Sequence, residues 1–258
     1  MKVELRVSSG SPNESKKSCF ICNKIIIAQK NKRSNKRSIV YQASEQKSEG
    51  FHAYRIAPAI IKQVMDPFLS ISVIRQNEVS FARPQAGYTS FFWVCEESQG
   101  GLTIETGSLG TKTIAPGSTG ALFCGGGVVC RTKPQHQSVR YLHVDIKITM
   151  KKEQLDAHWL SCMHDDSGGI TVPGHEPMFY VGLRESLPDS WNKQIQFVGS
   201  YDGSKWGAKE AKAKKQWFLQ GEPLQEPLDI FSSLAMSDRV LNKLVLLKYR
   251  RGEFGQLH

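Results

Sequence analysis

Residues 81–134 have the sequence FARPQAGYTSFFWVCEESQGGLTIETGSLGTKTIAPGSTGALFCGGGVVCRTKP. Short apolar and β-branched runs alternate here with turn residues, which is typical of antiparallel strands. The pattern predicts strands at 91–94, 102–104 and 119–123, with Gln99-Gly100-Gly101 as the turn between the first two. The glycine run 125–127 lets the chain bend sharply before the alternation resumes. The stretch therefore predicts a series of antiparallel hairpins.

The order of these motifs resembles the two halves of a cupin barrel, and their details resemble the N-terminal domain of the pirin family. The family pattern His-Pro-His-Arg-Gly-Phe-Glu-Thr is matched by residues 83–90, RPQAGYTS. The family's Pro-Gly-Asp strand, followed by Gly-Arg-Gly-Ile-Leu-His-Ala-Glu, is matched by residues 116–118, PGS, and 125–132, GGGVVCRT. The resemblance implies a first cupin domain over residues 38–150.

The pirin family holds a metal ion with three histidines and a glutamate, and the resemblance places these positions at Arg83, Gln85, Cys130 and Thr132. None of the four keeps an imidazole or a carboxylate, which an iron or copper(II) site of this kind needs. A permanently charged guanidinium at Arg83 would also repel a divalent cation. We therefore expect a pirin-type scaffold with a degenerate pocket at these positions, without a metal, another cofactor or a catalytic residue.

The second half of the chain resembles the rest of a pirin in a shortened form. Residues 171–183 are similar to the Pro-x-Gly-His hairpin of the second pirin barrel, and residues 217–228, WFLQGEPLQEPL, are similar to that barrel's last strand and exit. The resemblance implies a contracted second cupin domain over residues 151–234. The expected fold class is thus all-β, with two cupin-type antiparallel barrels and a helix over residues 235–258.

The strand expected over residues 139–148, VRYLHVDIKI, alternates cleanly. Tyr141, His143, Asp145 and Lys147 share one face, and the apolar residues are expected to point mainly inward.

The C-terminal helix has clear start and stop signals. Ser237 is the predicted N-cap and Gly252 ends the helix. The apolar residues of the predicted inward face are Val240, Leu241, Leu244 and Val245. In pirins a helix ending in Gly-x-Phe-Gly, matched here by residues 252–255, returns to cover the first barrel.

The positive charge is concentrated at the N-terminus. Residues 1–50 hold eleven Lys and Arg against four Glu, so they carry +7 of the formal net charge of +10. Eight basic residues and no acid fall within residues 16–37. Because such like-charge blocks are usually disordered, residues 1–37 are predicted to be a mobile arm that could contact nucleic acid.

Two further groups of residues have side chains of metal-binding types. Cys19 and Cys22 have zinc-type spacing, but no second pair completes a four-ligand site. A second set lies within eighteen residues without regular spacing, and we expect no metal there: His158, Cys162, His164 and His175.

Composition limits the compartment and the class of protein. Six cysteines in 258 residues are too few for a disulfide scaffold. The apolar run Ile25–Ala28 is far too short to span a bilayer. We expect a monomer in the cytoplasm, or in the nucleus of a eukaryote, with no membrane partner.

Three function classes remain open. The loss of all four ligands favours a metal-free pirin-like protein that binds a small ligand or a protein partner, with a regulatory role. A quercetin 2,3-dioxygenase-type oxidoreductase, which the resemblance implies, would need a site built from Cys130, His136 or His143. A nuclear or nucleic-acid-associated cofactor would use residues 16–37, and its binding would weaken steeply with salt.

Overall fold

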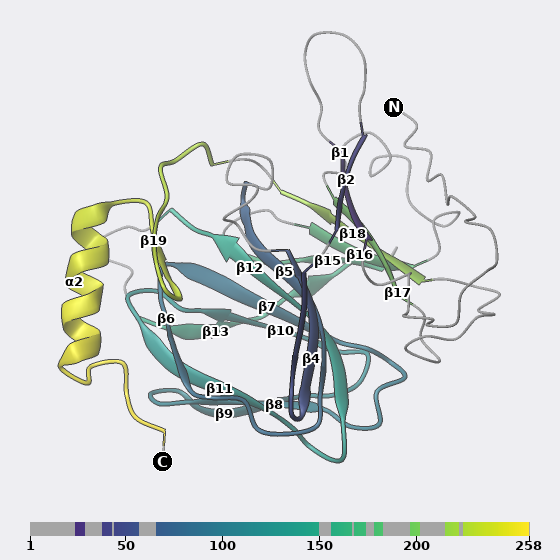
Figure 1. Ribbon diagram of the computed structural model, residues 1–258, viewed down its shortest axis with the longest axis horizontal. Coiled ribbons are helices and arrows are strands. Elements are labelled where there is room, and N and C mark those ends of the chain that lie inside the picture. The colour runs from purple at the N-terminus through teal and green to yellow at the C-terminus, as the bar shows by residue number, and fades with distance from the viewer. Residues whose placement is uncertain are drawn as a thin grey trace, which may run out of the picture.

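The computed structural model describes residues 24–28, 38–42, 44–56, 66–149, 156–166, 168–173, 178–182, 197–201, 215–221 and 224–257. Over these ranges the chain consists mainly of antiparallel strands and ends in helix α2 (Arg239–Arg250), as Figure 1 shows. The expected all-β fold with a C-terminal helix is therefore confirmed. Within the described part of the chain, no helix is both long and apolar enough to cross a membrane.

Sheet 1 has seven strands in the order β13-β10-β7-β12-β5-β4-β3. Its central strand β12 pairs along its length with β5 on one side and β7 on the other. The bounds of the seven strands are β3 (Ser44–Ser48), β4 (Phe51–Ile56), β5 (Phe68–Gln76), β7 (Tyr88–Val94), β10 (Thr119–Phe123), β12 (Val139–Lys147) and β13 (His158–Leu160).

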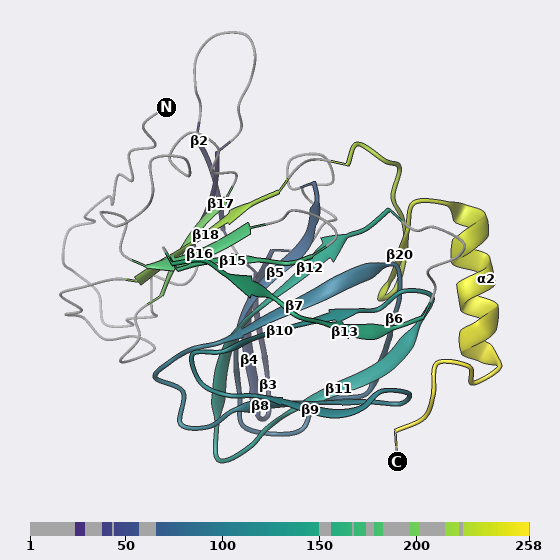
Figure 2. The same ribbon diagram turned by 180° about the vertical axis from the view of Figure 1, so that it is seen from behind.

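Sheet 2 faces sheet 1 and completes the first barrel. Its order is β6-β11-β8-β9, with β6 (Arg83–Gln85), β11 (Val128–Pro134), β8 (Leu102–Thr106) and β9 (Gly110–Ile114). A buried apolar cluster fills the space between the two sheets, and it includes Phe92, Val94, Leu102, Ile104, Leu122 and Tyr141. The two sheets lie opposite each other in both views (Figures 1 and 2).

The strands predicted at 91–94, 102–104 and 119–123 are present, but the predicted hairpin at residues 99–101 is wrong. Strand β7 belongs to sheet 1 and β8 to sheet 2, so this turn carries the chain from one sheet to the other. The hairpin partner of β8 is β9. The glycine run 125–127 makes a second crossing, from β10 in sheet 1 to β11 in sheet 2.

Sheet 3 packs against the other face of sheet 1. Its strand order is β14-β15-β16-β18-β17-β1-β2. A second buried cluster joins Phe91, Trp93 and Leu142 of sheet 1 to Ile170 and Leu219 of sheet 3. The bounds are β1 (Lys24–Ala28), β2 (Ser38–Gln42), β14 (Met163–His164), β15 (Gly169–Thr171), β16 (Met178–Gly182), β17 (Phe197–Tyr201) and β18 (Lys215–Gln220).

Strand β1 lies inside the range that was expected to be a mobile arm. It pairs with β17 and with β2, so these five residues form part of a sheet. The other residues of the range 1–37 lie outside the described ranges. The domain boundaries at residues 37, 150 and 234 therefore remain predictions.

Both faces of β12 are buried, which corrects the expectation that mainly the apolar residues point inward. Leu142 and Val144 belong to the cluster against sheet 3, whereas Tyr141 belongs to the cluster inside the first barrel. Asp145 lies on the same face of β12 as Tyr141, as expected from the alternation, and is also buried. The barrel interior therefore contains an acidic side chain.

The C-terminal segment returns to the first barrel, as the resemblance implied. Strands β19 (Asp229–Phe231) and β20 (Leu234–Met236) form a hairpin before α2. The backbone N–H of Ala235 donates to the carbonyl oxygen of Ala86, and the N–H of Val129 donates to that of Phe254. These bonds attach the C-terminal segment next to β6 and to β11.

Two details of the helix differ from the prediction. Asp238 is the N-cap in place of Ser237, because its carboxylate accepts a hydrogen bond from the Val240 N–H. The docked face is also different: Asn242 and Val245 are buried, while Val240 and Leu244 are exposed. Asn242 takes the central inward position because its Nδ2 donates to the Asp229 carbonyl and carboxylate oxygens.

Gly87 provides a test of this attachment. Gly87 has φ of +85°, and a Cβ atom there would lie 1.8 Å from the Ala235 carbonyl oxygen. We predict that Gly87→Ala lowers the free energy of unfolding in urea by several kcal/mol, roughly 3 or more, because the hairpin β19–β20 must move away.

The matched control is Gly110→Ala, at φ of +73° with no atom within 4 Å of the added Cβ. This substitution should lower the free energy of unfolding by about 1 to 2 kcal/mol, because it adds only backbone strain. Equal losses in the two variants would contradict the proposed contact at Gly87.

Candidate functional site

The four positions that the sequence resemblance assigned to the family's metal ligands lie on one pair of strands. Strands β6 and β11 run antiparallel, with Cys130 opposite Arg83 and Val128 opposite Gln85. Arg83 is exposed, Gln85 and Thr132 are half-buried, and Cys130 is buried. The two strands thus bring the four residues together, but the Arg83 side chain does not fill the barrel interior.

Thr132 belongs to a hydrogen-bond network inside the barrel. Its hydroxyl donates to Gln76 Oε1 at 2.9 Å and lies 3.1 Å from the Ser80 hydroxyl. The Tyr141 hydroxyl also donates to Gln76 Oε1, at 2.8 Å, and Gln76 is fully buried. Thr132 therefore acts as a structural group at the position that the sequence resemblance assigned to a metal-binding glutamate.

Cys130 is a neutral thiol at ordinary pH. Burial raises its pKa to about 12, the nearby Asp145 carboxylate adds to this, and the Arg83 guanidinium opposes it. Burial likewise raises the pKa of Cys124 well above its usual value. Because the thiolate is the nucleophile and the metal ligand, neither sulfur is prepared for these roles.

A row of polar side chains crosses sheet 1 opposite β6 and β11. Ser70 on β5 and Ser90 on β7 lie directly across from Asp145 on β12. Ser70 donates to Asp145 Oδ2 at 2.5 Å, and Ser90 donates to Oδ1 at 2.8 Å. Gln85 Oε1 accepts a hydrogen bond from the Cys124 thiol at 3.4 Å and lies 3.4 Å from the Ser90 hydroxyl, whose proton is directed to Asp145. We refer to Ser70, Gln85, Ser90, His143 and Asp145 as the polar cluster.

Asp145 is ionised although it is buried. Burial is the largest influence and raises its pKa, but the charge and proximity of His143 and the hydrogen bonds from Ser70 and Ser90 outweigh it, so the pKa is about 2. His143 Nε2 lies 3.1 Å from Asp145 Oδ1. The cluster therefore places a negative charge in the barrel, with an imidazole as its partner.

His143 is held flat against an aromatic ring. Its imidazole stacks on Phe92 with the centroids 4.6 Å apart and the planes 2° from parallel. Its Nε2 atom is buried and approaches Asp145, but no acceptor within the described part of the chain has the geometry of a hydrogen bond to it. A buried nitrogen in this situation favours an additional polar partner.

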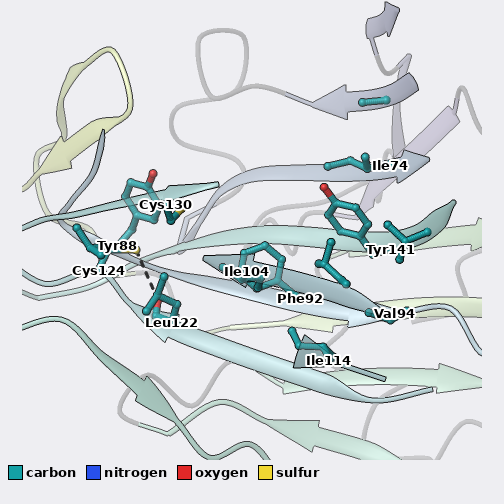
Figure 3. Close-up of a cluster of buried hydrophobic side chains, with 14 of the residues drawn as sticks. Ile74, Tyr88, Phe92, Val94, Ile104, Ile114, Leu122, Cys124, Cys130 and Tyr141 are labelled. Atoms are coloured by element: carbon teal, nitrogen blue, oxygen red, sulfur yellow. Dashed lines mark hydrogen bonds between the residues drawn. The ribbon is translucent and has the colours of Figure 1, made fainter. Parts of the chain in front are cut away.

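The polar cluster is bordered by apolar side chains. Figure 3 shows Tyr88, Cys124 and Cys130 at one end of the buried cluster and Tyr141, Val94 and Ile74 at the other, with Phe92 and Ile104 between them. The polar cluster therefore lies at the border of a packed apolar core.

The residues present do not fit a metal. Within the described ranges, no group of three or more His, Cys, Asp and Glu side chains is arranged to hold an ion. Arg83 is a cation, Thr132 donates to Gln76, and Cys130 keeps its proton. The absence of a metal in the protein itself stays a prediction.

The other cysteine and histidine side chains that could bind a metal ion do not come together at one site within the described residues either. Cys130 is buried and His143 half-buried inside the barrel, but His136 is exposed in the loop after β11. Exposed His158 and His164 contact the Asp156 carbonyl and the Thr119 hydroxyl, respectively.

Cys19, Cys22 and His175 lie outside the described residues, so their roles remain untested. The same holds for nucleic-acid binding through residues 16–37, of which only strand β1 is described.

The sequence placed Asp145 and His143 on one strand face but did not identify their cluster. The alternation of residues 139–148 was the available signal. It could not show that Ser70 and Ser90, 75 and 55 residues away from Asp145, pair with the same strand. Asp145 therefore had no visible partner in the sequence.

Comparison with known proteins finds solved structures with a similar fold. A crystal structure of quercetin 2,3-dioxygenase from Acinetobacter baumannii has 14% identity and a TM-score of 0.60, over 83% of this chain and 96% of that chain. A second crystal structure of that enzyme from the same organism has 12% identity and a TM-score of 0.55, over 83% and 89%. The bacterial pirin YhhW from Escherichia coli, in complex with nickel(II), has 8% identity and a TM-score of 0.44, over 70% and 96%.

No protein-family model matches the sequence, and no curated protein matches it. At identities this low the likeness shows the fold alone. The two-barrel, cupin-type β fold that the sequence predicted is confirmed at that level.

Asp145 predicts a pH effect on stability. Its pKa falls from about 3.9 in the unfolded chain to about 2 in the fold. Its contribution is therefore present above about pH 5 and is lost as the pH falls through 4 towards 2. We expect Asp145→Asn to lower the unfolding free energy in urea by about 2 kcal/mol at pH 7, and the difference from the parent chain to shrink below pH 4.

The control is Glu49→Gln, which removes an exposed carboxylate and should change little at either pH. A difference between Asp145→Asn and the parent chain that stays constant from pH 7 to pH 3 would contradict an ionised, paired Asp145.

The strand register predicts that a metal site can be rebuilt. The parent chain should bind no stoichiometric iron or copper. The fourfold variant Arg83→His, Gln85→His, Cys130→His and Thr132→Glu should bind about one ion, because it supplies imidazole and carboxylate ligands at adjacent positions of paired strands. Elemental analysis after dialysis measures both.

Thr132→Glu alone serves as the folding control, because it removes the bond to Gln76 without completing a ligand set. A folded fourfold variant that takes up no metal would show that these positions do not correspond to the family's metal site.

Proposed function

We propose that this chain is a metal-free binding protein with a cupin-type fold, and that its first barrel binds a small, mainly apolar organic molecule. The observation that carries the proposal is the ionised Asp145 inside the barrel, held by Ser70, Ser90 and His143. A buried charge seldom stabilises a fold better than apolar packing would. Its presence among apolar side chains favours a role in recognition.

The chemistry of the cluster limits the ligand. Both Asp145 oxygens already accept hydrogen bonds, so Gln85 and His143 are the members that remain for a ligand's polar end. Phe92, Tyr88 and Leu122 are already packed in the buried apolar cluster, so the body of the ligand belongs at the end of the barrel beside Gln85 and Arg83. An anionic group would be repelled by Asp145 and belongs at the edge of the barrel.

Arg83 supplies the complementary charge at that edge. Arg83 is exposed. Burial raises the pKa of Cys130 and Tyr141, and the positive charge of Arg83 opposes this rise at both groups. The guanidinium therefore lies close to the barrel interior. Guanidinium groups bind carboxylates and related anions in a bidentate manner. We infer that the ligand is a small organic acid with an apolar body.

Quercetin 2,3-dioxygenase activity remains the alternative because the proteins of similar fold include that enzyme. In this chain the residues at the family's ligand positions do not fit a metal, and neutral Cys130 does not replace one. We therefore expect no turnover of quercetin with dioxygen.

The proposal can be tested with the fluorescent probe 1-anilinonaphthalene-8-sulfonate, which combines an apolar body with an anionic sulfonate. We expect about one equivalent to bind to the folded chain, with enhanced fluorescence. Arg83→Glu should weaken binding by at least about fivefold, because it replaces attraction with repulsion at the edge of the barrel. Gln85→Phe should abolish binding, because it replaces the half-buried amide that would contact the ligand's polar end with a bulky apolar ring.

Arg75→Glu is the matched control, since Arg75 is an exposed arginine of sheet 1 on strand β5. Urea midpoints show whether each variant is folded. Equal effects of the two arginine variants, or full binding by folded Gln85→Phe, would refute a site inside the first barrel.

A further inference from the structure

Helix α2 exposes an apolar stripe that the fold does not use. Val240, Leu244 and Leu247 are 64%, 51% and 46% exposed. Their spacing of four and three residues places them on one face of the helix, two turns long. We call these three residues the outer stripe.

The outer stripe faces away from the barrel. The opposite side of α2 is fixed by Asn242, which donates to Asp229, and by Val245, which is buried with Met236 and Phe254. Figures 1 and 2 show α2 at the outer edge of the molecule, beyond the hairpin β19–β20. The outer stripe is therefore accessible in the folded chain.

Every charged residue between 239 and 250 is basic. At 3.6 residues per turn, Arg239, Lys243 and Arg250 fall on one side of the outer stripe, and Lys248 falls on the other. The stripe is thus an apolar seam with positive charges on both sides. A helix that packs against this stripe would need an apolar seam of its own, with acidic residues on both sides.

We propose that the outer stripe is a docking surface for an amphipathic helical segment of another protein, with an apolar seam and acidic residues on its flanks. Leucine-type side chains of that segment pack against Val240, Leu244 and Leu247. Its carboxylates pair with the basic residues on both sides of α2, which sets the register and the choice of partner.

The charges exclude a second copy as the preferred occupant. Two α2 helices packed through their outer stripes would bring four basic residues of each chain together, with no acid from either helix. A membrane is also less suitable. Interfacial helices carry a broad apolar face rich in Trp, Phe and Leu, whereas the outer stripe is two turns long and aliphatic.

The test uses the full chain and a fluorescein-labelled peptide of about three heptads, with Leu at positions a and d and Glu at e and g. Fluorescence anisotropy should show saturable binding that weakens with salt. Leu244→Glu should weaken binding by at least about tenfold. Phe81→Glu should leave it unchanged, since Phe81 is also exposed, at 86%, but lies outside α2.

Charge reversal gives the sharper readout. The double variant Lys243→Glu and Arg250→Glu should lose affinity for the acidic peptide and gain affinity for the same peptide with Lys at e and g. These side chains are exposed, so the fold should be unchanged, which the urea midpoint checks.

Three results would overturn the proposal. The acidic and basic peptides could bind the parent chain equally well, or Leu244→Glu and Phe81→Glu could have equal effects. The third result is that the acidic peptide does not bind, while Leu244 is needed for another interaction of the chain. That interaction would be cosedimentation with phosphatidylserine vesicles or formation of a dimer.

Discussion

The position of β12 between β5 and β7 is the constraint on which the rest of the structure depends. Its backbone is hydrogen-bonded on both sides, and its two faces serve different cores. A slip of one residue would exchange Tyr141 and Asp145 for Leu142 and Val144 in the barrel interior. The register of this strand therefore keeps the two sheets packed and also places the carboxylate of the candidate site.

The scaffold and the chemistry of the first barrel are separable. At the positions that the sequence resemblance assigned to metal ligands, Thr132 donates to Gln76 and Gln85 accepts from Cys124. The buried charge of the interior lies on sheet 1, in the row that contains Asp145. Both carboxylate oxygens of Asp145 accept hydrogen bonds from serine hydroxyls and the His143 imidazole lies close by, so the charge can be kept without an ion.

The sequence predicted the strands well and their partners poorly. Alternation and glycine punctuation located β7, β8 and β10, but a turn signal does not say whether the next strand joins the same sheet, so the turn at residues 99–101 was assigned to a hairpin. The docked face of α2 was missed because Asn242, a polar residue, occupies its centre through bonds to Asp229. The polar cluster could not be identified from the sequence, because its members come together only through pairing of strands that are distant in the sequence.

Strands β6 and β11 connect the two proposed sites. The Ala86 carbonyl next to Gln85 accepts from Ala235, and the Val129 N–H next to Cys130 donates to Phe254. The segments that contain Ala235 and Phe254 also pack with Val245 of α2 in one buried cluster. If occupancy of one proposed site shifts these two strands, then by linkage each occupant changes the affinity of the other by the same factor. Ala235 also belongs to the apolar cluster of the barrel, so backbone hydrogen bonds and side-chain packing both join the C-terminal segment to the barrel.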